Sequence, residues 1–243
     1  GMIRYLLPLF PDASHYYAPV IIVLAVISIF YGALLAIGQN DMMRLVAFSS
    51  VSHFGFIVLG IFVMTSQGLA GSSFYMVNHG FSTGALFLIV GFLAARRGSA
   101  KISDFGGVAK VAPVMAGITL LAGLSSLALP GMSSFVSEFL VLLGTFAVNK
   151  TAAVIATLGI VLAAFYILWM YQRTMTGEPG DEVRATVSEV TPRELVAKIQ
   201  ADAVKVLATP DGRERLAQQG MELLPYTPEQ FAACAEPGSV KIA

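Results

Sequence analysis

Residues 111–147 read VAPVMAGITLLAGLSSLALPGMSSFVSEFLVLLGTFA, an apolar stretch with Leu129-Pro130-Gly131 at its middle and one acidic residue, Glu138, shortly after. The stretch exceeds the roughly 20 apolar residues that one straight helix needs to cross a bilayer. Proline removes a backbone donor and glycine permits a reversal of the chain, so Pro130 and Gly131 predict a helix broken within the membrane. A plain proline kink is the alternative that the pattern leaves open.

Four further stretches are long and apolar enough to cross a membrane. They cover residues 19–38, 44–65, 70–95 and 151–172. Each must be helical, because an unpaired peptide group in lipid costs several kcal/mol. With the broken span they predict an all-α polytopic membrane protein of about five transmembrane helices. Residues 3–10 are expected to be the last turns of another span, as in a sequence that begins within a domain.

Charge divides the chain into two compositional parts. The chain is 56% hydrophobic and 12% charged, against about 25% charged residues in an ordinary soluble domain. Residues 1–172 hold four acidic residues, whereas the remainder holds eleven of the 15. We therefore expect a transmembrane bundle over 1–176, a polar linker over 177–190 and a short soluble helical tail over 191–243.

Basic residues in the loops predict the orientation of the bundle. With five spans, one side of the membrane receives Arg44, Arg96, Arg97, Lys101, Lys110 and Arg173, and the other receives Arg4 and Lys150. The excess of positive charge marks the cytoplasmic side, so the N-terminus is expected outside and the tail inside. Asp41 and Arg44 are then charges of a cytoplasmic loop. No basic patch suggests a nucleic-acid partner.

Glu138 is the acidic residue expected inside a span. An ionisable group at the centre of a transmembrane helix costs roughly 2.5–3.5 kcal/mol and is a functional candidate for that reason. Glu138 follows the predicted break with no charged neighbour in SSFVSEFLVLLG. It is interpreted as a proton carrier. The alternative is a carboxyl group that stays protonated and donates to a backbone carbonyl.

Two histidines lie in the middle of neighbouring spans, His53 in SSVSHFGF and His79 in MVNHGFSTG. Imidazole both accepts and donates a proton near neutral pH. Polar neighbours in the sequence are Ser49, Ser50, Ser52, Ser73, Asn78, Ser82 and Thr83. Together these side chains predict a hydrated proton path that leads to Glu138. A structural role for each histidine, satisfied within the core, remains the alternative.

The sequence predicts no catalytic residue, no metal site and no cofactor. Cys234 is the single cysteine, so thiolate ligands and an intrachain disulfide are excluded. The three histidines, His15, His53 and His79, show no spacing typical of zinc ligands.

Five motifs run collinearly through residues 1–186. They are GMIRYLLPLFPDAS, IFYGALLAIGQNDMMRLVAFSSVSHFGF, FYMVNHGFSTGALFLIVG, LPGMSSFVSEFLVLLGTF and LAAFYILWMYQR. On these motifs the chain resembles the chain M type of antiporter-like, proton-translocating subunits of bacterial NADH–quinone oxidoreductase, respiratory complex I. The resemblance implies the second of two inverted five-helix repeats, in the cell inner membrane, with other complex I membrane subunits and the lipid bilayer as partners.

The resemblance also implies roles for single residues. Glu138 falls on the acidic residue of the second broken helix, which ends the proton relay, and His53 and His79 fall on the two histidines of the polar axis. Met43 stands where the family's loop usually has a lysine, which leaves Asp41 and Arg44 there. Proton translocation coupled to quinone reduction elsewhere in the complex is the expected function.

The C-terminal part resembles a different family. Roughly residues 191–234 resemble the C-terminal end of periplasmic solute-binding proteins of the tripartite tricarboxylate transport type, without a full lobe or ligand cleft. The chain therefore reads as a chimera, by gene fusion, mis-assembly or design. Two alternatives to proton translocation follow: a non-catalytic membrane protein that acts by interaction or by perturbing the bilayer, and a solute-binding module that rests on the tail alone.

Overall fold

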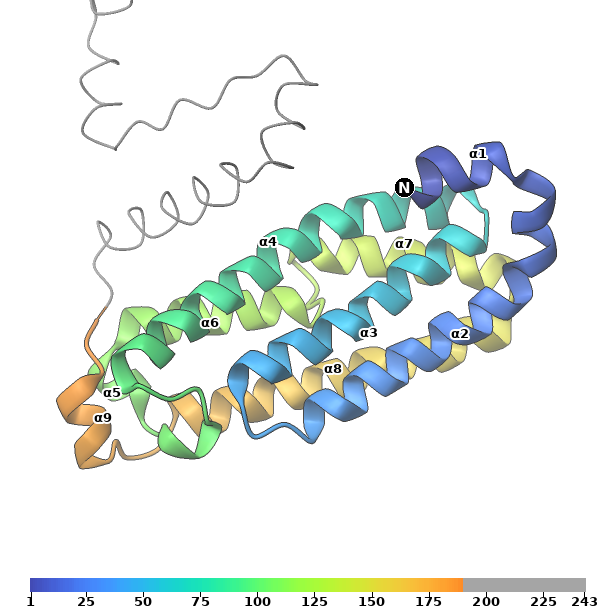
Figure 1. The fold of residues 1–243 in the computed structure, drawn as a ribbon. Coiled ribbons are helices and arrows are strands. Elements are labelled where there is room, and N and C mark those ends of the chain that lie inside the picture. Colours follow the sequence, from blue (N-terminus) through green and yellow to red (C-terminus); the bar gives the residue numbers. More distant parts are fainter. Residues whose placement is uncertain (190–243) are drawn as a thin grey trace, which may run out of the picture. The chain divides into compact units, whose positions relative to one another are not determined.

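The computed structural model describes residues 1–189, and these form a helical bundle without a β-strand. The elements are η1 (Met2–Leu6), α1 (Leu7–Leu9), α2 (Pro11–Ile37), α3 (Met42–Phe62), α4 (Ser66–Arg97), η2 (Ile102–Asp104), α5 (Val108–Val111), α6 (Pro113–Ser126), α7 (Ser133–Val148), α8 (Lys150–Met175) and α9 (Asp181–Thr186). In Figure 1, α2, α3, α4 and α8 are long rods, and α6 and α7 follow each other end to end. The predicted tail lies outside the described residues.

Four helices, α2, α3, α4 and α8, are each long and apolar enough to cross a membrane. The half-helices α6 and α7 have 14 and 16 residues, so neither reaches across by itself, and the two together make the broken fifth span. The predicted fold, an all-α polytopic membrane protein with one broken span, is confirmed. The helices extend past the predicted apolar stretches, because α4 has 32 residues and α2 starts at Pro11.

Between α6 and α7 the backbone leaves the helical conformation. Ala128 and Gly131 have positive φ values of 56° and 101°, which a helix cannot contain. Pro130 between them has no N–H to donate. The amide of Leu129 still reaches the carbonyl of Leu124 at 3.3 Å, and that of Met132 reaches Leu129 at 2.9 Å. The helix is thus broken, where a plain kink would have kept helical φ values on both sides.

Helix ends are capped by polar side chains of the loops. Asp41 caps α3, accepting the amide of Arg44 at 2.9 Å, and Thr65 caps α4, accepting the amide of Gly68 at 3.1 Å. The α2–α3 loop is tied to the loop after α4 by a hydrogen bond from the Met42 amide to the Ala100 carbonyl. Both loops therefore lie at the end of the bundle that we call the α9 end.

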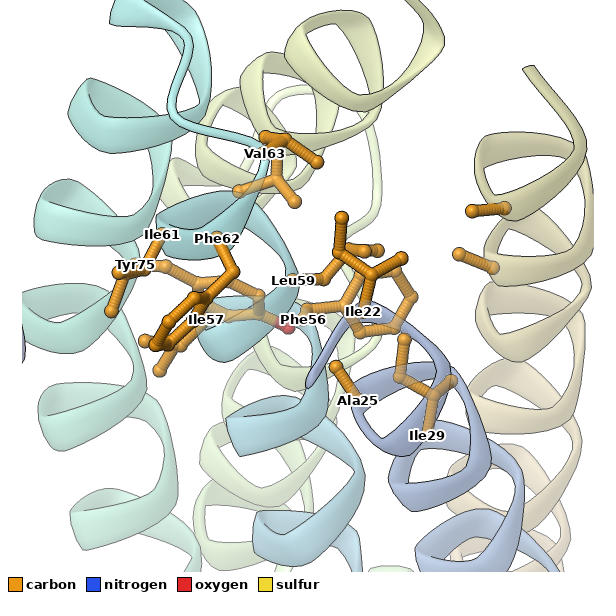
Figure 2. Packing of buried hydrophobic residues seen from close by; sticks show 13 residues of the cluster. Ile22, Ala25, Ile29, Phe56, Ile57, Leu59, Ile61, Phe62, Val63 and Tyr75 are labelled. Atoms are coloured by element: carbon orange, nitrogen blue, oxygen red, sulfur yellow. The ribbon is translucent and has the colours of Figure 1, made fainter. Parts of the chain in front are cut away.

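A buried apolar core cluster lies where α2 packs against α3. Ile22, Ala25 and Ile29 of α2 face Phe56 and Leu59 of α3 in Figure 2. Lipid offers no hydrophobic gain for such contacts, so close packing must supply the attraction between helices.

Gly55 permits the close approach of α2 and α3. A Cβ placed on Gly55 would lie 2.8 Å from the carbonyl oxygen of Ala25. Ser52 on the same helix donates to the Ile29 carbonyl at 2.9 Å. The small residue and the hydroxyl together fix the register of the two helices.

The segment expected as a polar linker contains the packed helix α9. Val183 and Val187 are both buried. Their spacing of four residues places them on one helical face, which is the physical reason for a folded turn in an otherwise polar sequence.

Candidate functional site

The side chain of Glu138 points into the bundle, with 3% of the residue exposed. The approach of α7 to α4 explains this position. Gly71 of α4 faces α7 so closely that a Cβ there would lie 2.8 Å from the Val141 amide nitrogen and 3.0 Å from the Ser137 carbonyl oxygen. The α7 backbone is thereby held against α4, and the face that carries Glu138 and Ser137 turns away from lipid.

Tyr75 of α4 lies between His53 and Glu138. The Tyr75 hydroxyl donates a hydrogen bond to Glu138 Oε1. The same hydroxyl oxygen lies 2.6 Å from His53 Nδ1. His53 Nδ1 itself is 3.9 Å from Glu138 Oε1, so the tyrosine oxygen is the shorter path between imidazole and carboxylate.

These contacts determine the protonation of the His53 ring. Because the Tyr75 hydroxyl gives its hydrogen to Glu138, its oxygen accepts from His53, and Nδ1 carries the proton. His53 Nε2 is then an acceptor, and the hydroxyl of Ser126 lies 3.3 Å from it. Ser126 is the last residue of α6. Both halves of the broken span therefore contribute to one group: Ser126, His53, Tyr75 and Glu138.

His79 belongs to a second group of hydrogen bonds. Its Nε2 lies 2.8 Å from Ser50 Oγ, and its Nδ1 lies 3.0 Å from Thr83 Oγ1. The centroids of the His53 and His79 rings are 5.2 Å apart, with the ring planes inclined by 47°. All four ring nitrogens are bonded to hydroxyl groups. The two rings therefore lie close together without a hydrogen bond between their nitrogens.

Polar side chains also compensate for the break. The Ser134 hydroxyl of α7 donates to the Ser125 carbonyl of α6, and Asn78 Nδ2 donates to Ser137 Oγ at 2.6 Å. Broken helices at membrane depth are tolerated where such groups satisfy the freed backbone. Glu138 Oε2, in contrast, is buried and has no hydrogen-bond partner among residues 1–189.

The structure brings three of the residues singled out in the sequence, Glu138, His53 and His79, into one buried cluster. Sequence reasoning did not identify Tyr75. A signal was available, because Tyr75 precedes His79 by four residues on one helix and so shares its face. Asp41 and Arg44 lie at the α9 end, where Asp41 acts as a helix cap and Arg44 is exposed.

Metal-ligating side chains do not gather in this part of the chain. Among residues 1–189, no group of three or more His, Cys, Asp or Glu side chains could hold a metal ion.

Comparison with known families agrees with the fold. The sequence model of the family described as NADH:quinone oxidoreductase/Mrp antiporter, TM, matches residues 1–164. The chain belongs to this antiporter family. Residues of both half-helices and of the whole buried cluster fall within the matched range.

Relatives in the antiporter family are longer than this chain. NADH-quinone oxidoreductase subunit M of Mycobacterium tuberculosis is 55% identical over 196 residues, which cover 81% of this chain and 35% of that protein. Subunit M of Rickettsia prowazekii is 46% identical over 178 residues, covering 73% and 36%. The chain thus spans about a third of the length of these relatives.

Solved structures show the same arrangement of helices. A chain of respiratory complex I from Thermus thermophilus with bound NADH superposes with a TM-score of 0.75 at 32% identity, covering 87% of this chain and 44% of that one. A chain of the Mrp complex from Dietzia sp. gives a TM-score of 0.67 at 26% identity, covering 76% and 34%.

Proposed function

We propose that the described part of the chain conducts protons as one repeat of a membrane subunit of an NADH–quinone oxidoreductase. The relay consists of His79, His53, Tyr75 and Glu138. One observation carries the proposal: in a buried site beside a broken helix, a single tyrosine hydroxyl contacts both an imidazole and a carboxylate. Placing an ionisable group at such depth costs free energy, so the ionisable groups that occur there typically have a function.

The transfer from His53 to Glu138 needs no water. A proton that arrives at His53 Nε2 makes the ring cationic, and the ring then releases the proton on Nδ1 to the Tyr75 oxygen. Tyr75 simultaneously passes its own hydroxyl proton to Glu138 Oε1. Glu138 ends protonated and His53 ends neutral with its proton on Nε2, so the ring must return to the Nδ1 tautomer before the next transfer.

The step between His79 and His53 is the point of control in this arrangement. The nitrogens of both rings are bonded to the hydroxyls of Ser50, Thr83 and Ser126 and to Tyr75. A proton crosses between the rings only after one of these hydroxyls turns away, or after water enters between the rings.

The direction of transfer follows from the predicted orientation. The excess of Lys and Arg in the loops at the α9 end supports a cytoplasmic position of that end. The half-helix α7 continues from the break toward the opposite end of the bundle, and Glu138 lies on it. Release from Glu138 along α7 therefore leads outward. The bilayer and other membrane subunits, as in the complex I of Thermus thermophilus, are the proposed partners.

Glu138→Gln tests the proposal. The full chain is reconstituted in vesicles, a potassium gradient with valinomycin supplies the driving force, and an internal pH-sensitive dye reports proton flux. We expect the substitution to lower the flux at least tenfold, because an amide cannot carry the proton. Asp12→Asn, at an exposed carboxylate in the first turn of α2, is the control and should keep the flux. Equal flux in all three proteins would discard the relay.

The alternative, a non-catalytic membrane protein that acts by interaction or by perturbing the bilayer, predicts a different pattern. An effect of expression on cell growth that is unchanged by Glu138→Gln supports it. An effect that requires Glu138 supports proton conduction.

A further inference from the structure

The half-helix α6 begins without a capping side chain of its own. Its N-cap residue is Ala112, which has no hydrogen-bonding side chain, and Pro113 follows at the first helical position. The next two backbone N–H groups would be left without partners in an uncapped helix. Both donate instead to Glu189: Val114 to Oε2 and Met115 to Oε1, each at 2.9 Å.

Glu189 reaches this position because the segment before it is attached to the bundle. We call residues 176–189 the strap. Its contacts with the rest of the bundle begin with the Thr176 carbonyl, which accepts the Gly107 amide at 2.8 Å. Further contacts are the ion pairs Lys110–Glu178 and Arg97–Glu182 and the hydrogen bond from Arg96 to Ser188. The strap thus follows the α9 end of the bundle and ends at the start of α6.

The two ends of α6 carry different groups of contacts. At the N-terminus, a carboxylate interacts with the unpaired N–H groups and with the positive end of the helix dipole. At the C-terminus, Ser126 contacts His53 Nε2, and the Ser125 carbonyl accepts from Ser134. A helix of 14 residues is about 21 Å long, so the two groups of contacts lie at opposite ends of one short element.

We propose that Glu189 is a positioning residue for the relay. By holding the first turn of α6, it sets the depth at which the Ser126 hydroxyl meets His53, and so keeps the ring in the tautomer that can donate to Tyr75. The inference rests on the proposed function for its purpose, although the coupling between the two ends of α6 is a structural property that can be measured without proton flux.

The test uses the purified full chain in lipid nanodiscs and the substitution Glu189→Ala. Two signals are recorded: hydrogen exchange of the Val114 and Met115 amides, and the ¹⁵N resonances of the His53 ring. We expect both amides to exchange at least tenfold faster, because they lose their only described acceptor. The ring should shift from the Nδ1–H tautomer toward a mixture of tautomers. Asp181→Asn, at an exposed carboxylate of the same strap that is not one of the named attachments, should change neither signal.

Two outcomes would overturn the inference. Faster exchange with an unchanged His53 spectrum would make Glu189 a local helix cap and overturn its positioning role. Unchanged exchange would overturn the cap as well. If Glu189→Ala does not fold, Glu189→Gln provides the same comparison, since its amide keeps one acceptor oxygen and should release one of the two amides. If the vesicle assay shows no proton flux, the relay is rejected. The amide exchange and the His53 spectrum still test the coupling between the two ends of α6.

Discussion

The two halves of the broken span are held in the bundle in different ways. α7 is packed along its length against α4, where Gly71 meets the α7 backbone and Gly144 would place a Cβ 2.6 Å from the Gly68 amide nitrogen. α6 also buries one face, but a Cβ on its Gly123 would meet only the Ile167 side chain, and hydrogen bonds tie its two ends to Glu189 and to His53. Backbone packing is spread over several turns and fixes the register, whereas each end contact of α6 depends on one side chain.

This difference assigns separate tasks to the two half-helices. Glu138 lies on α7, whose position is fixed by close packing, so the distance from Glu138 to Tyr75 is determined by the backbone. Ser126 lies on α6, which runs from the Glu189 cap to His53. Under the proposed positioning role of Glu189, the position of the acid is set by backbone packing, whereas that of the hydroxyl facing His53 depends on the cap at the α9 end.

The largest effect is expected from Gly71→Ala. The added methyl group would approach the α7 backbone within 3.0 Å, and overpacking against a backbone that cannot move costs about 3 kcal/mol. Gly80→Ala on the same helix is the matched control, because its added methyl group would have no atom of another residue in the described part of the chain within 4 Å. The free energy of unfolding, measured by titration with a denaturing detergent, should fall for the first variant only. Equal values for the two would contradict the packing difference.

A smaller effect is expected within the break itself. Gly131 has φ 101°, and a Cβ in this region of φ costs roughly 1–2 kcal/mol. Gly131→Ala should lower the free energy of unfolding by that amount, although no atom lies near the added methyl group. Gly117→Ala, in the helical part of α6, should raise it by up to about 1 kcal/mol. If both substitutions changed the free energy of unfolding in the same direction, the positive φ of Gly131 would not be needed for the break.

The sequence predicted those features of the fold that lipid enforces. The apolar stretches around α2, α3, α4 and α8 had to be helical, and Pro130-Gly131 had to interrupt the fifth span, because backbone groups in a bilayer have no water to bind. The attachment of the strap was not predictable in the same way. Glu189 meets Val114 across 75 residues, and no local pattern indicates a cap supplied from so far along the chain.

The candidate site was predictable in part. Glu138, His53 and His79 stood out because polar groups are rare in apolar stretches. Tyr75 did not, because tyrosine is half apolar and is a common side chain in membrane helices. Only the structure shows that its hydroxyl faces both His53 and Glu138.

The smallest effect concerns the exposed ion pair of the strap. A hydrogen bond from the Lys110 ammonium, together with its charge, holds the pKa of Glu178 below its ordinary value. A lowered pKa stabilises the folded form above the unfolded pKa of about 4.3, and this contribution is lost as the pH falls through the lowered value.

Hydrogen exchange at the Gly107 amide measures this loss, because the amide is bonded to the strap at Thr176. After correction for the intrinsic exchange rate, protection should fall slightly in acid for the unchanged protein. In Glu178→Gln the acid-dependent loss should be smaller. Asp104, whose pKa is also lowered, by hydrogen bonds from Ser99 and Ser103, remains in both proteins, so the difference isolates Glu178. Identical pH profiles would show that the ion pair does not hold the strap.

The most direct test of the central claim compares two buried tyrosines. Tyr75→Phe removes the hydroxyl between His53 and Glu138, whereas Tyr166→Phe removes a buried hydroxyl of α8 that lies near Ser49. Proton flux through the full chain in vesicles should fall at least tenfold for Tyr75→Phe and stay close to that of the unchanged protein for Tyr166→Phe. Undiminished flux in Tyr75→Phe would contradict a relay through the tyrosine.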